Sequence, residues 1–270
     1  MGERPTLSVI IVGWNERHYL GPCLEALAPP ANVAAMEVVV VDNGSSDGSA
    51  DWLRARHPAV RVVANPENRG VAPARNQGLD GTSGTYRVLL DADTVVQPGA
   101  LEALVDGMER FPEAGLSGPK LVDAARRLQF SCRAFPTALS KLARQAPAPV
   151  RARLLRREEY RDWDHARPRW VDYVIGACQC IRGTVLRDVG PLDERIFYGP
   201  EDIDFCLRLW RAGHRVLYNP AAVVVHHEQR SARRSAARYA RHFGALWYFF
   251  RKHGYLIQRP TFADSGRPAT

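Results

Sequence analysis

Long hydrophobic runs are absent from this sequence of 270 residues. A helix that crosses a bilayer needs about 20 consecutive apolar residues, and the apolar stretch at residues 7–12 falls far short of that. The sequence also lacks a secretory signal peptide, which would combine a charged start, an apolar middle and a small-residue cleavage site. These absences argue against an integral membrane protein, and we expect a cytoplasmic location.

Cysteine is scarce: the chain has five, irregularly spaced, and their number is odd. A protein held together by disulfides carries an even and regularly placed set, so we expect no disulfide framework. Cys178 and Cys180 lie in an apolar run typical of a strand, where both sulfurs would share one face. A zinc site would need further ligands at suitable spacing, so buried free thiols are the better interpretation.

Lysine is scarcer still, occurring only at positions 120, 141 and 252, so arginine carries almost all of the positive charge. The formal net charge is +8. Zinc-finger, homeodomain and RNP-like patterns are missing, which argues against a nucleic-acid partner. Arginine matches the geometry of phosphate groups, and a basic surface also attracts anionic membranes. The charge therefore favours nucleotide phosphates and a lipid surface as partners.

What the first half of the chain does contain is a repeated alternation of strand and helix patterns. Apolar, β-branched runs alternate with segments of helical spacing and helix-capping residues. Repeated β–α–β units place parallel strands in one sheet with helices on both faces, so the sequence predicts an α/β fold with a mostly parallel central sheet. The expected strands are 7–12, 37–41, 60–64 and 86–90, and the expected helices are 15–28, a segment ending near 56, 72–79 and 98–109.

The second half of the chain is less regular. Residues 132–169 are rich in proline and arginine, and we expect an irregular, mobile insertion there. Patterns return with a strand at 171–182, helices ending at 189 and spanning 203–212, short strands at 215–218 and 223–226, and a final helix at 233–253. We expect residues 259–270 to form a disordered tail.

The final helix has an apolar stripe that could either dock on the rest of the protein or lie on a membrane. Both alternatives remain open, because arginines flank its aromatic side chains. The same helix could also join two copies of the chain in a homodimer. The stripe comprises Ala236, Tyr239, Phe243, Leu246, Trp247 and Phe250.

Two carboxylates follow the expected strand at 86–90, in the segment Asp91-Ala92-Asp93. A strand that ends in two acids places negative charge at the carboxyl edge of a sheet, where open α/β folds bind ligands. Such acids need a partner, and a divalent cation shared with a nucleotide diphosphate is one. A solvated turn with acidic caps is the alternative that this segment alone leaves open.

A second acidic cluster, Glu201-Asp202-Ile203-Asp204, begins an expected helix. Capping would explain acids at a helix N-terminus, but Asp193 and Glu194 just upstream add more charge than a cap needs. A carboxylate held there could act as a general base. The pair His226-His227 ends an apolar strand and could complete a metal site, or it could be structural.

Residues 65–78 form a loop and the start of a helix. Free backbone N–H groups at that start, together with Arg75, suit an anionic diphosphate. An ordinary surface loop is the alternative.

Taken in order, these segments resemble the family 2 glycosyltransferases with a GT-A fold, and most closely the bacterial rhamnosyltransferase-like branch. The resemblance covers residues 6–250 and rests on Trp14-Asn15, residues 39–49, residues 68–78, Asp91-Ala92-Asp93, residues 176–178, Glu201-Asp202 and His226. It implies one GT-A catalytic domain over residues 1–258, plus the tail. We expect a nucleotide-binding half at 1–118, an acceptor-binding half at 119–230 and a C-terminal helix at 231–258.

The resemblance also implies which residues bind the nucleotide. Asp42 matches the position that reads the base, and Trp14, beside Asn15, stands where the family often has a tyrosine that could stack on the base. Asn68 and Arg75 match positions near the nucleotide and its diphosphate. Val12-Gly13 replaces the commoner Pro-Thr, which is a departure from the family pattern.

For catalysis, the resemblance implies that Asp91-Ala92-Asp93 faces the diphosphate and that Asp91 and Asp93 bind Mg²⁺ or Mn²⁺. His226 matches a histidine that binds the metal in some members, with His227 as the alternate. Asp202 matches the catalytic base, and Glu201 its companion on the acceptor side. We therefore expect an inverting enzyme that moves one sugar from a UDP- or dTDP-linked donor to a hydroxyl of a saccharide or lipid-linked acceptor in cell-surface polysaccharide assembly.

Three other functions fit parts of the sequence. A nucleotidyltransferase usually carries a Gly-rich loop with Arg and Lys after the first strand, and residues 13–16 do not fit that pattern. Loss of Asp93 or Asp202 would favour a non-catalytic module that binds nucleotide sugars, and both are present. A processive synthase would bring transmembrane helices and a Gln-x-x-Arg-Trp segment, which this sequence lacks.

Overall fold

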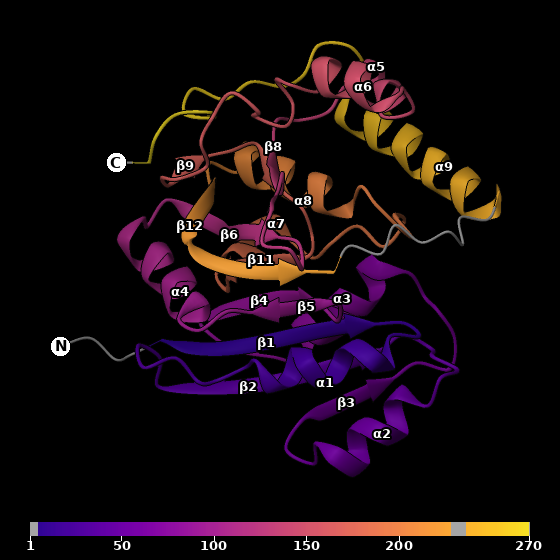
Figure 1. The fold of residues 1–270 in the computed structure, drawn as a ribbon, viewed down its shortest axis with the longest axis vertical. Coiled ribbons are helices and arrows are strands. Elements are labelled where there is room, and N and C mark those ends of the chain that lie inside the picture. Colours follow the sequence, from indigo (N-terminus) through magenta and orange to yellow (C-terminus); the bar gives the residue numbers. More distant parts are fainter. Residues whose placement is uncertain (1–4, 228–235, 270) are drawn as a thin grey trace.

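The computed structural model describes residues 5–227 and 236–269 and confirms the α/β fold (Figure 1). A ten-stranded sheet within these residues contains β1 (Thr6–Gly13), β2 (Ala35–Asp42), β3 (Arg61–Ala64), β4 (Tyr86–Asp91), β5 (Thr94–Val96), β6 (Ala114–Val122), β7 (Leu128–Gln129), β9 (Arg169–Trp170), β11 (Cys178–Arg182) and β12 (Arg215–His226). The strand order is β3-β2-β1-β4-β11-β6-β12-β5, with β7 on β6 and β9 on β12. A separate pair joins β8 (Cys132–Arg133) to β10 (Tyr173–Val174).

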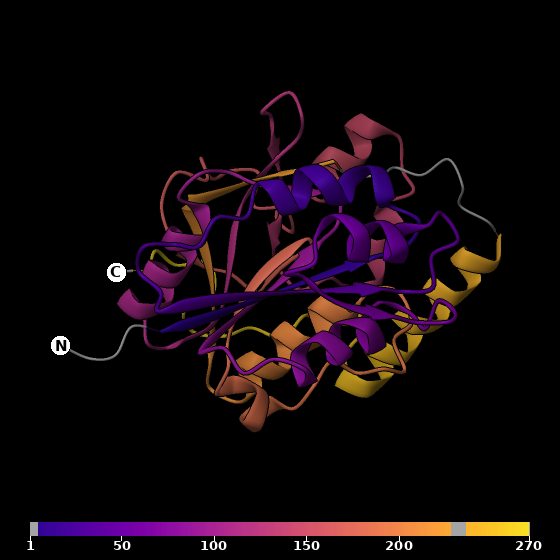
Figure 2. The same cartoon turned by 90° about the horizontal axis from the view of Figure 1, so that it is seen from below.

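Helices lie on both faces of the sheet, as predicted (Figure 2). The helices that precede residue 130 connect successive strands of the N-terminal part of the sheet, which is the arrangement expected of β–α–β units. The described helices are α1 (Arg17–Glu25), α2 (Ser49–Arg56), α3 (Val71–Asp80), α4 (Ala100–Arg110), α5 (Ala138–Ala143), α6 (Ala148–Leu154), α7 (Val185–Val189), α8 (Glu201–Arg211) and α9 (Ala236–His253).

Register places the ends of three parallel strands at one edge of the sheet. Gly13 of β1 lies opposite Asp42 of β2, and Val12 lies opposite Asp91 of β4. Strand β11 then runs antiparallel to β4, with Cys178 opposite Leu90, so the segment just before β11 returns to the same edge. The carboxyl edge of the sheet is therefore where acids from β2 and β4 meet residues 176–177.

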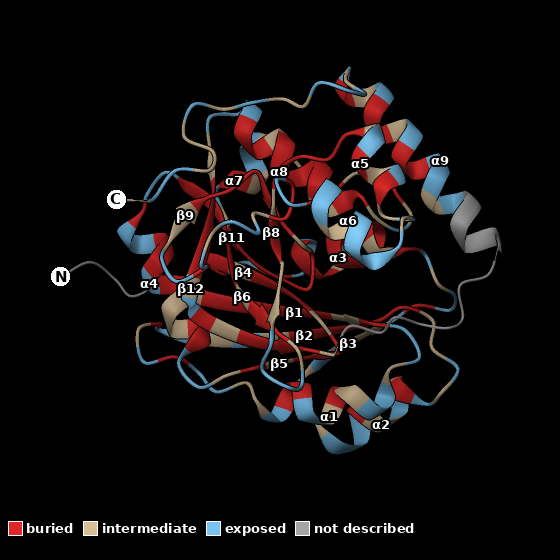
Figure 3. Cartoon of the chain, turned by 45° about the horizontal axis from the view of Figure 1, so that its top comes forward, coloured by how far each residue is buried: buried red, intermediate tan, exposed pale blue. Residues whose placement is uncertain are grey.

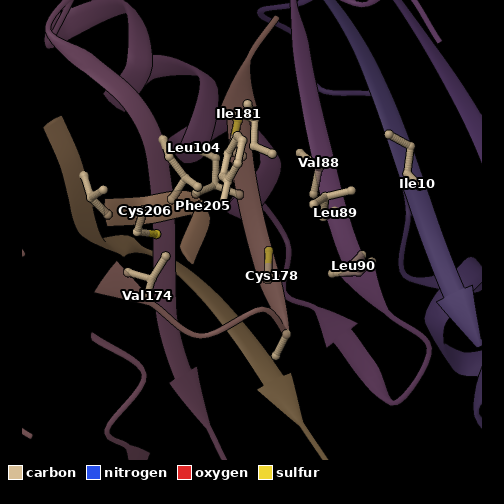
Figure 4. Close-up of a cluster of buried hydrophobic side chains, with 14 of the residues drawn as sticks. Ile10, Val88, Leu89, Leu90, Leu104, Val174, Cys178, Ile181, Phe205 and Cys206 are labelled. Atoms are coloured by element: carbon tan, nitrogen blue, oxygen red, sulfur yellow. The ribbon is translucent and has the colours of Figure 1, made fainter. Parts of the chain in front are cut away.

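All five cysteines are free and buried, as expected from their spacing. Cys178 and Cys206 belong to the main apolar core together with Leu89, Ile181 and Phe205 (Figure 4). Burial raises the pKa of each thiol well above its ordinary value, so these cysteines act as small apolar side chains rather than as nucleophiles.

The insertion and the C-terminal segment are more ordered than expected. The insertion contains α5 and α6, and the Thr137 and Ser140 side chains form a capping box at the start of α5. The final segment is not a disordered tail, because Gly266 and Arg267 exchange backbone hydrogen bonds with Trp170 at 2.8 and 3.0 Å. The ring of Phe262 also stacks on that of Trp210.

The strand predicted at 171–182 is broken into β10 and β11 around Gly176, whereas the two strands predicted at 215–226 form one strand, β12, with a bulge. A glycine between two strand segments marks a close approach of another chain segment. At Gly176 the approaching side chain is that of Arg75.

Helix α9 docks on the protein through a different face from the predicted stripe. Leu246 and Phe250 of that stripe are buried, but the buried face also includes Ala245 and Phe249, and Phe243 and Trp247 are 51% and 65% exposed. The side chains of Ala236 and Tyr239 lie outside the described residues.

A buried carboxylate holds the end of α9 against α8. The Asp204 side chain is fully buried and lies 2.8 Å from Arg208, 2.6 Å from the Lys252 ammonium and 2.8 Å from His253. Burial alone would raise the pKa of Asp204, but the hydrogen bond from His253 and the charges of Arg208 and Lys252 hold it below its ordinary value. This stabilisation is therefore present above the unfolded pKa of about 3.9 and is lost as pH falls further.

We expect Asp204→Asn to lower the free energy of unfolding by about 3 kcal/mol, because the substitution removes the buried negative charge that pairs with Arg208 and Lys252, of which only Lys252 keeps a second carboxylate, that of Asp193. Urea titration at neutral pH measures this change. The matched control is Asp51→Asn, whose side chain is 90% exposed and whose loss should change stability by about 0.5 kcal/mol or less. Equal unfolding midpoints for the two variants would show that the Asp204 network does not stabilise the fold.

Candidate active site

Two acids and one histidine meet at the carboxyl edge of the sheet. Strand β4 ends at Asp91, and β5 begins three residues later at Thr94, which lies opposite His226 at the end of β12. Asp93 therefore lies beside His226, and their side-chain O and Nε2 atoms are 3.6 Å apart. One ligand atom from each of Asp91, Asp93 and His226 falls within 4.8 Å of the others.

The electrostatics of this cluster favour a bound cation. Burial and the charge of Asp91 raise the pKa of Asp93, and the charge of His226 opposes this. Two nearby carboxylates and an imidazole form an oxygen-rich donor set of the kind that Mn²⁺ or Mg²⁺ accepts. The three side chains therefore fit the divalent cation expected from the sequence.

Gln129 holds the histidine in position. Its Oε1 lies 2.9 Å from His226 Nδ1, and its Nε2 donates to the His226 carbonyl at 2.9 Å. An Nδ1–H that donates to Gln129 leaves the Nε2 lone pair directed at Asp93, which is the usual support for a metal-binding histidine. The ring of His227 instead stacks on Tyr19, so His226 is the member of the pair that belongs to the cluster.

Arg75 of α3 connects this cluster to the second acidic segment. Its guanidinium lies 2.7 Å from Asp91 and 3.2 Å from Glu201, and it donates to the Gly176 carbonyl at 2.8 Å. The side chain is 3% exposed. The arginine predicted to face a diphosphate thus lies between two carboxylates, where its charge compensates both.

Residues 176–177 complete the connection to Asp202. The Gly176 N–H donates to Asp202 Oδ2 at 3.1 Å, and the Ala177 carbonyl accepts from the Asp91 N–H at 3.0 Å. A Cβ on Gly176 would lie 2.5 Å from an Arg75 nitrogen, so only glycine permits this approach. Residues more than a hundred positions apart are therefore joined through one short segment.

Asp202 lies half-buried in the first turn of α8 with a fixed orientation. Its Oδ1 accepts from the Ile203 N–H at 2.8 Å, while Oδ2 accepts from Gly176. The carboxylate keeps further lone pairs that could accept a proton or a hydroxyl group.

Glu201 next to it is buried, and burial and the charge of Asp202 raise its pKa to about 7, against the effect of Arg75. Its Oε2 is a buried atom with no hydrogen-bond partner among the described residues. A carboxyl group with that pKa can carry or release a proton near neutral pH.

The nucleotide-side residues predicted from the sequence gather around the ends of β1 and β2. Asp42 is buried and accepts a hydrogen bond from the Ser45 hydroxyl. Asn15 receives the Ser46 N–H on its Oδ1 at 2.8 Å, and Trp14 is 41% exposed. The partly exposed ring of Trp14 is therefore open to contact at the end of β1.

Asn68 and Ala92 shape the same edge by packing and hydrogen bonds. Asn68 Oδ1 accepts from the Gly70 N–H at 2.9 Å and from Asn43 Nδ2 at 3.2 Å, which orders the loop before α3. Ala92 is fully buried against Gly13. Asn68 therefore orders the backbone before α3, and Ala92 packs against the end of β1.

Sequence reasoning missed Gln129 and Ser45. Gln129 lies 97 positions from the histidine that it holds, and a single glutamine in a polar segment carries no pattern that signals this contact. Ser45 lies in a turn rich in Asn, Gly and Ser, where capping already accounts for such a residue.

Comparison with known proteins identifies the family. The sequence matches "Glycosyl transferase family 2" over residues 8–127 and "Glycosyl transferase family group 2" over residues 88–263. The chain belongs to glycosyltransferase family 2. It is 30% identical over 246 residues to N-acetylglucosaminyl-diphospho-decaprenol L-rhamnosyltransferase of Mycobacterium tuberculosis, covering 85% of this chain and 80% of that protein. The predicted rhamnosyltransferase-like resemblance is thereby confirmed, and this family 2 chain is an enzyme of the transferase class.

Other relatives show how far the similarity extends. Pre-mycofactocin glycosyltransferase of M. tuberculosis is 30% identical over 217 residues, which cover 79% of this chain but 42% of that protein. Among solved structures, the mannosyltransferase PcManGT from Pyrobaculum calidifontis in complex with GDP-Man and Mn²⁺ aligns with a TM-score of 0.64 at 24% identity, over 95% of this chain and 66% of that one. This similarity confirms the GT-A fold. No helix within residues 5–227 and 236–269 is long and apolar enough to cross a membrane.

Proposed function

We propose that this family 2 enzyme transfers one sugar from a nucleotide-diphosphate donor to a hydroxyl of a lipid-linked saccharide, with inversion at the sugar carbon. The observation that carries the proposal is the joining of Asp91 and Asp202 through Arg75 and residues 176–177. Such a site has a cluster for the leaving diphosphate and a separate carboxylate for the attacking hydroxyl. These are the two functions that a single displacement needs.

Asp202 is the proposed general base. Two backbone N–H groups orient its carboxylate, so that a free lone pair can accept the proton of the acceptor hydroxyl as the oxygen attacks. Glu201 and Arg75 are proposed as positioning residues, because their ion pair ties the start of α8 to Asp91. A single displacement by the acceptor hydroxyl would invert the sugar carbon.

Asp91, Asp93 and His226 are the proposed ligands of Mg²⁺ or Mn²⁺. When bound, the cation would offset the charge that develops on the leaving diphosphate. The related mannosyltransferase structure contains Mn²⁺ and GDP-Man, which supports a divalent cation beside a nucleotide sugar. The three ligand atoms lie within 4.8 Å of one another, so small side-chain adjustments would bring them to one ion.

Donor recognition is proposed for the half that contains β1 to β4, at residues 1–118, and acceptor recognition for residues 119–230. Trp14 would stack on the base, with Asn15 and Asp42 beneath it, and Asn68 and Ala92 would shape the loop at the diphosphate. UDP- and dTDP-linked sugars both fit this arrangement. The name of the relative 30% identical to this chain, which specifies a diphospho-decaprenol acceptor, supports a lipid-linked saccharide as the acceptor.

A panel of nucleotide sugars tests this proposal by thermal shift. With Mn²⁺ present, at least one UDP- or dTDP-sugar at 100 times its dissociation constant should stabilise the protein by about 2.7 kcal/mol, which raises the melting temperature by about 5 °C or more for a chain of this size. The same sugars with EDTA, and ATP with Mn²⁺, are the controls. Stabilisation by ATP but by none of the sugars would favour a nucleotidyltransferase and contradict the proposal.

A further inference from the structure

The described residues expose ten large apolar side chains, and six of them lie on two short helices and one turn. In α5 and α6 these side chains are spaced three and four residues apart, which places each pair on one face of its helix. Exposed apolar side chains gathered in this way mark an interaction surface. The six are Leu139, Leu142, Val150, Leu154, Leu256 and Ile257, with exposures from 44% to 77%.

The helices and the turn are connected in space. Helices α5 and α6 pack against each other, and the Ala138 N–H at the start of α5 donates to the Leu256 carbonyl at 2.8 Å. Figures 1 and 3 show α5 and α6 side by side near the C-terminal half of α9, with most of α6 in the colour of exposed residues. We call the six apolar residues the α5–α6 surface.

The charge around the α5–α6 surface is mainly positive, although Glu158 and Glu159 at its edge pair with Arg144. Residues 124–157 contain nine arginines and lysines and no aspartate or glutamate. Residues 251–263, at and after the end of α9, add Arg251 and Arg259, and Lys252 there is paired with Asp193 and Asp204. An apolar surface in a field of arginines complements the headgroup region of an anionic bilayer, where apolar side chains insert and cations meet lipid phosphates.

Helix α5 also carries Lys141, on which the charges of Arg144 and Glu158 act more strongly than that of Asp202, the proposed base. Lys141 lies between Leu139 and Leu142 in sequence, and its ammonium interacts electrostatically with Asp202. Leu139 and Leu142 therefore lie within one helical turn of a residue that interacts weakly with the proposed base. A lipid held at the α5–α6 surface would have its headgroup on the acceptor side of the site.

We infer that the α5–α6 surface binds an anionic lipid bilayer and so presents a lipid-linked acceptor to Asp202. This inference rests on the proposed function for the identity of the acceptor, whereas the binding of the bilayer does not. It assigns the membrane contact to α5 and α6, whereas the sequence left open a contact through the stripe of the final helix. Neither helix inserts deeply, because each has two turns at most.

Vesicle flotation with the full chain tests the inference. The parent should float with vesicles of phosphatidylcholine and phosphatidylglycerol and stay in solution with phosphatidylcholine alone, and added salt should weaken the binding. The triple variant Leu139→Gln, Leu142→Gln, Leu154→Gln should bind at least tenfold more weakly. All three side chains are exposed, so the variant should keep the parent's melting temperature within about 2 °C.

Trp247→Gln is the matched control, because Trp247 is 65% exposed on α9 and outside the α5–α6 surface. It should bind the vesicles as the parent does. Loss of binding in Trp247→Gln with normal binding in the triple variant would overturn the inference in favour of α9. Dimerisation of the parent in solution that the triple variant abolishes would assign the surface to a second copy of the chain.

A transfer assay separates this inference from the proposed function. The triple variant should transfer sugar to a water-soluble octyl glycoside at the parent's rate, and more slowly to a prenyl-diphosphate saccharide embedded in vesicles. A parent that binds vesicles but transfers sugar to neither acceptor would contradict the proposed function alone. A triple variant with the parent's rate on embedded acceptor would contradict the inference alone.

Discussion

Asp202→Asn should lower the rate of sugar transfer by about a thousandfold, within the range that a general base contributes. The amide cannot accept the proton of the acceptor hydroxyl, although it keeps the size and position of the carboxylate. Donor binding should stay within about threefold of the parent, because the predicted nucleotide contacts lie at β1, β2 and β4. Initial rates with saturating donor and acceptor measure the first effect, and donor-induced thermal shift measures the second.

The substitution has a structural consequence that needs its own control. Both Asp202 oxygens accept backbone N–H groups, and an amide can satisfy only one of them. Asp202→Glu keeps the charge but moves it by one methylene group, so it should retain more activity than Asp202→Asn. Rates within tenfold of the parent for a well-folded Asp202→Asn would remove Asp202 from the role of base.

Glu201→Gln distinguishes the base from its neighbour. Glu201 pairs with Arg75, and a neutral amide there would leave the guanidinium with one counter-charge, Asp91. We expect a smaller loss of rate, about tenfold, together with weaker binding of donor and cation through Asp91. A loss confined to the chemical step and as large as that of Asp202→Asn would instead identify Glu201 as the base.

The carboxyl edge of the sheet could be predicted from local patterns. Apolar strands followed by acids place Asp42 and Asp91 at that edge, whatever the rest of the fold does, and register confirms their alignment with β1. The free, buried state of the cysteines also follows from spacing alone. These predictions depend on short segments whose periodicity is strong.

Strand β6 could not be predicted, although it lies in the middle of the sheet. Its sequence includes Gly115, Gly118 and Pro119, which disfavour strands. The structure explains the glycines, since a Cβ on Gly118 would lie 2.7 Å from the Val174 side chain. The strand is held by β11 and β12, and such tertiary support leaves no periodic signal in the sequence.

The surroundings of side chains in α9 and of Arg75 could not be predicted from local patterns. Leu246 and Phe250 were predicted to face the same way as Phe243 and Trp247, but two of these four are exposed. A helical stripe specifies which side chains share a face, and the neighbouring segments decide where that face ends. Arg75 was likewise predicted from a loop pattern, whereas its position depends on Gly176, a hundred residues away.

Asp93→Asn should abolish the dependence of donor binding on Mn²⁺ and lower the transfer rate by about a thousandfold or more. The expected effect is large because Asp93 is one of three groups that offer the cation a ligand atom. In the absence of cation the variant should be at least as stable as the parent, since burial and Asp91 disfavour the Asp93 charge. Only the thermal shift caused by Mn²⁺ with donor should disappear.

Gln129→Leu tests the same metal site and should give a smaller effect than Asp93→Asn. It removes the hydrogen bond that orients His226 but leaves all three ligands, so the apparent affinity for Mn²⁺ should fall about 10- to 100-fold, with activity recovered at high Mn²⁺. Asp51→Asn, an exposed carboxylate on α2, should leave the Mn²⁺ titration unchanged. If Asp93→Asn and Asp51→Asn gave the same Mn²⁺ dependence, the cluster of Asp91, Asp93 and His226 would not be the metal site.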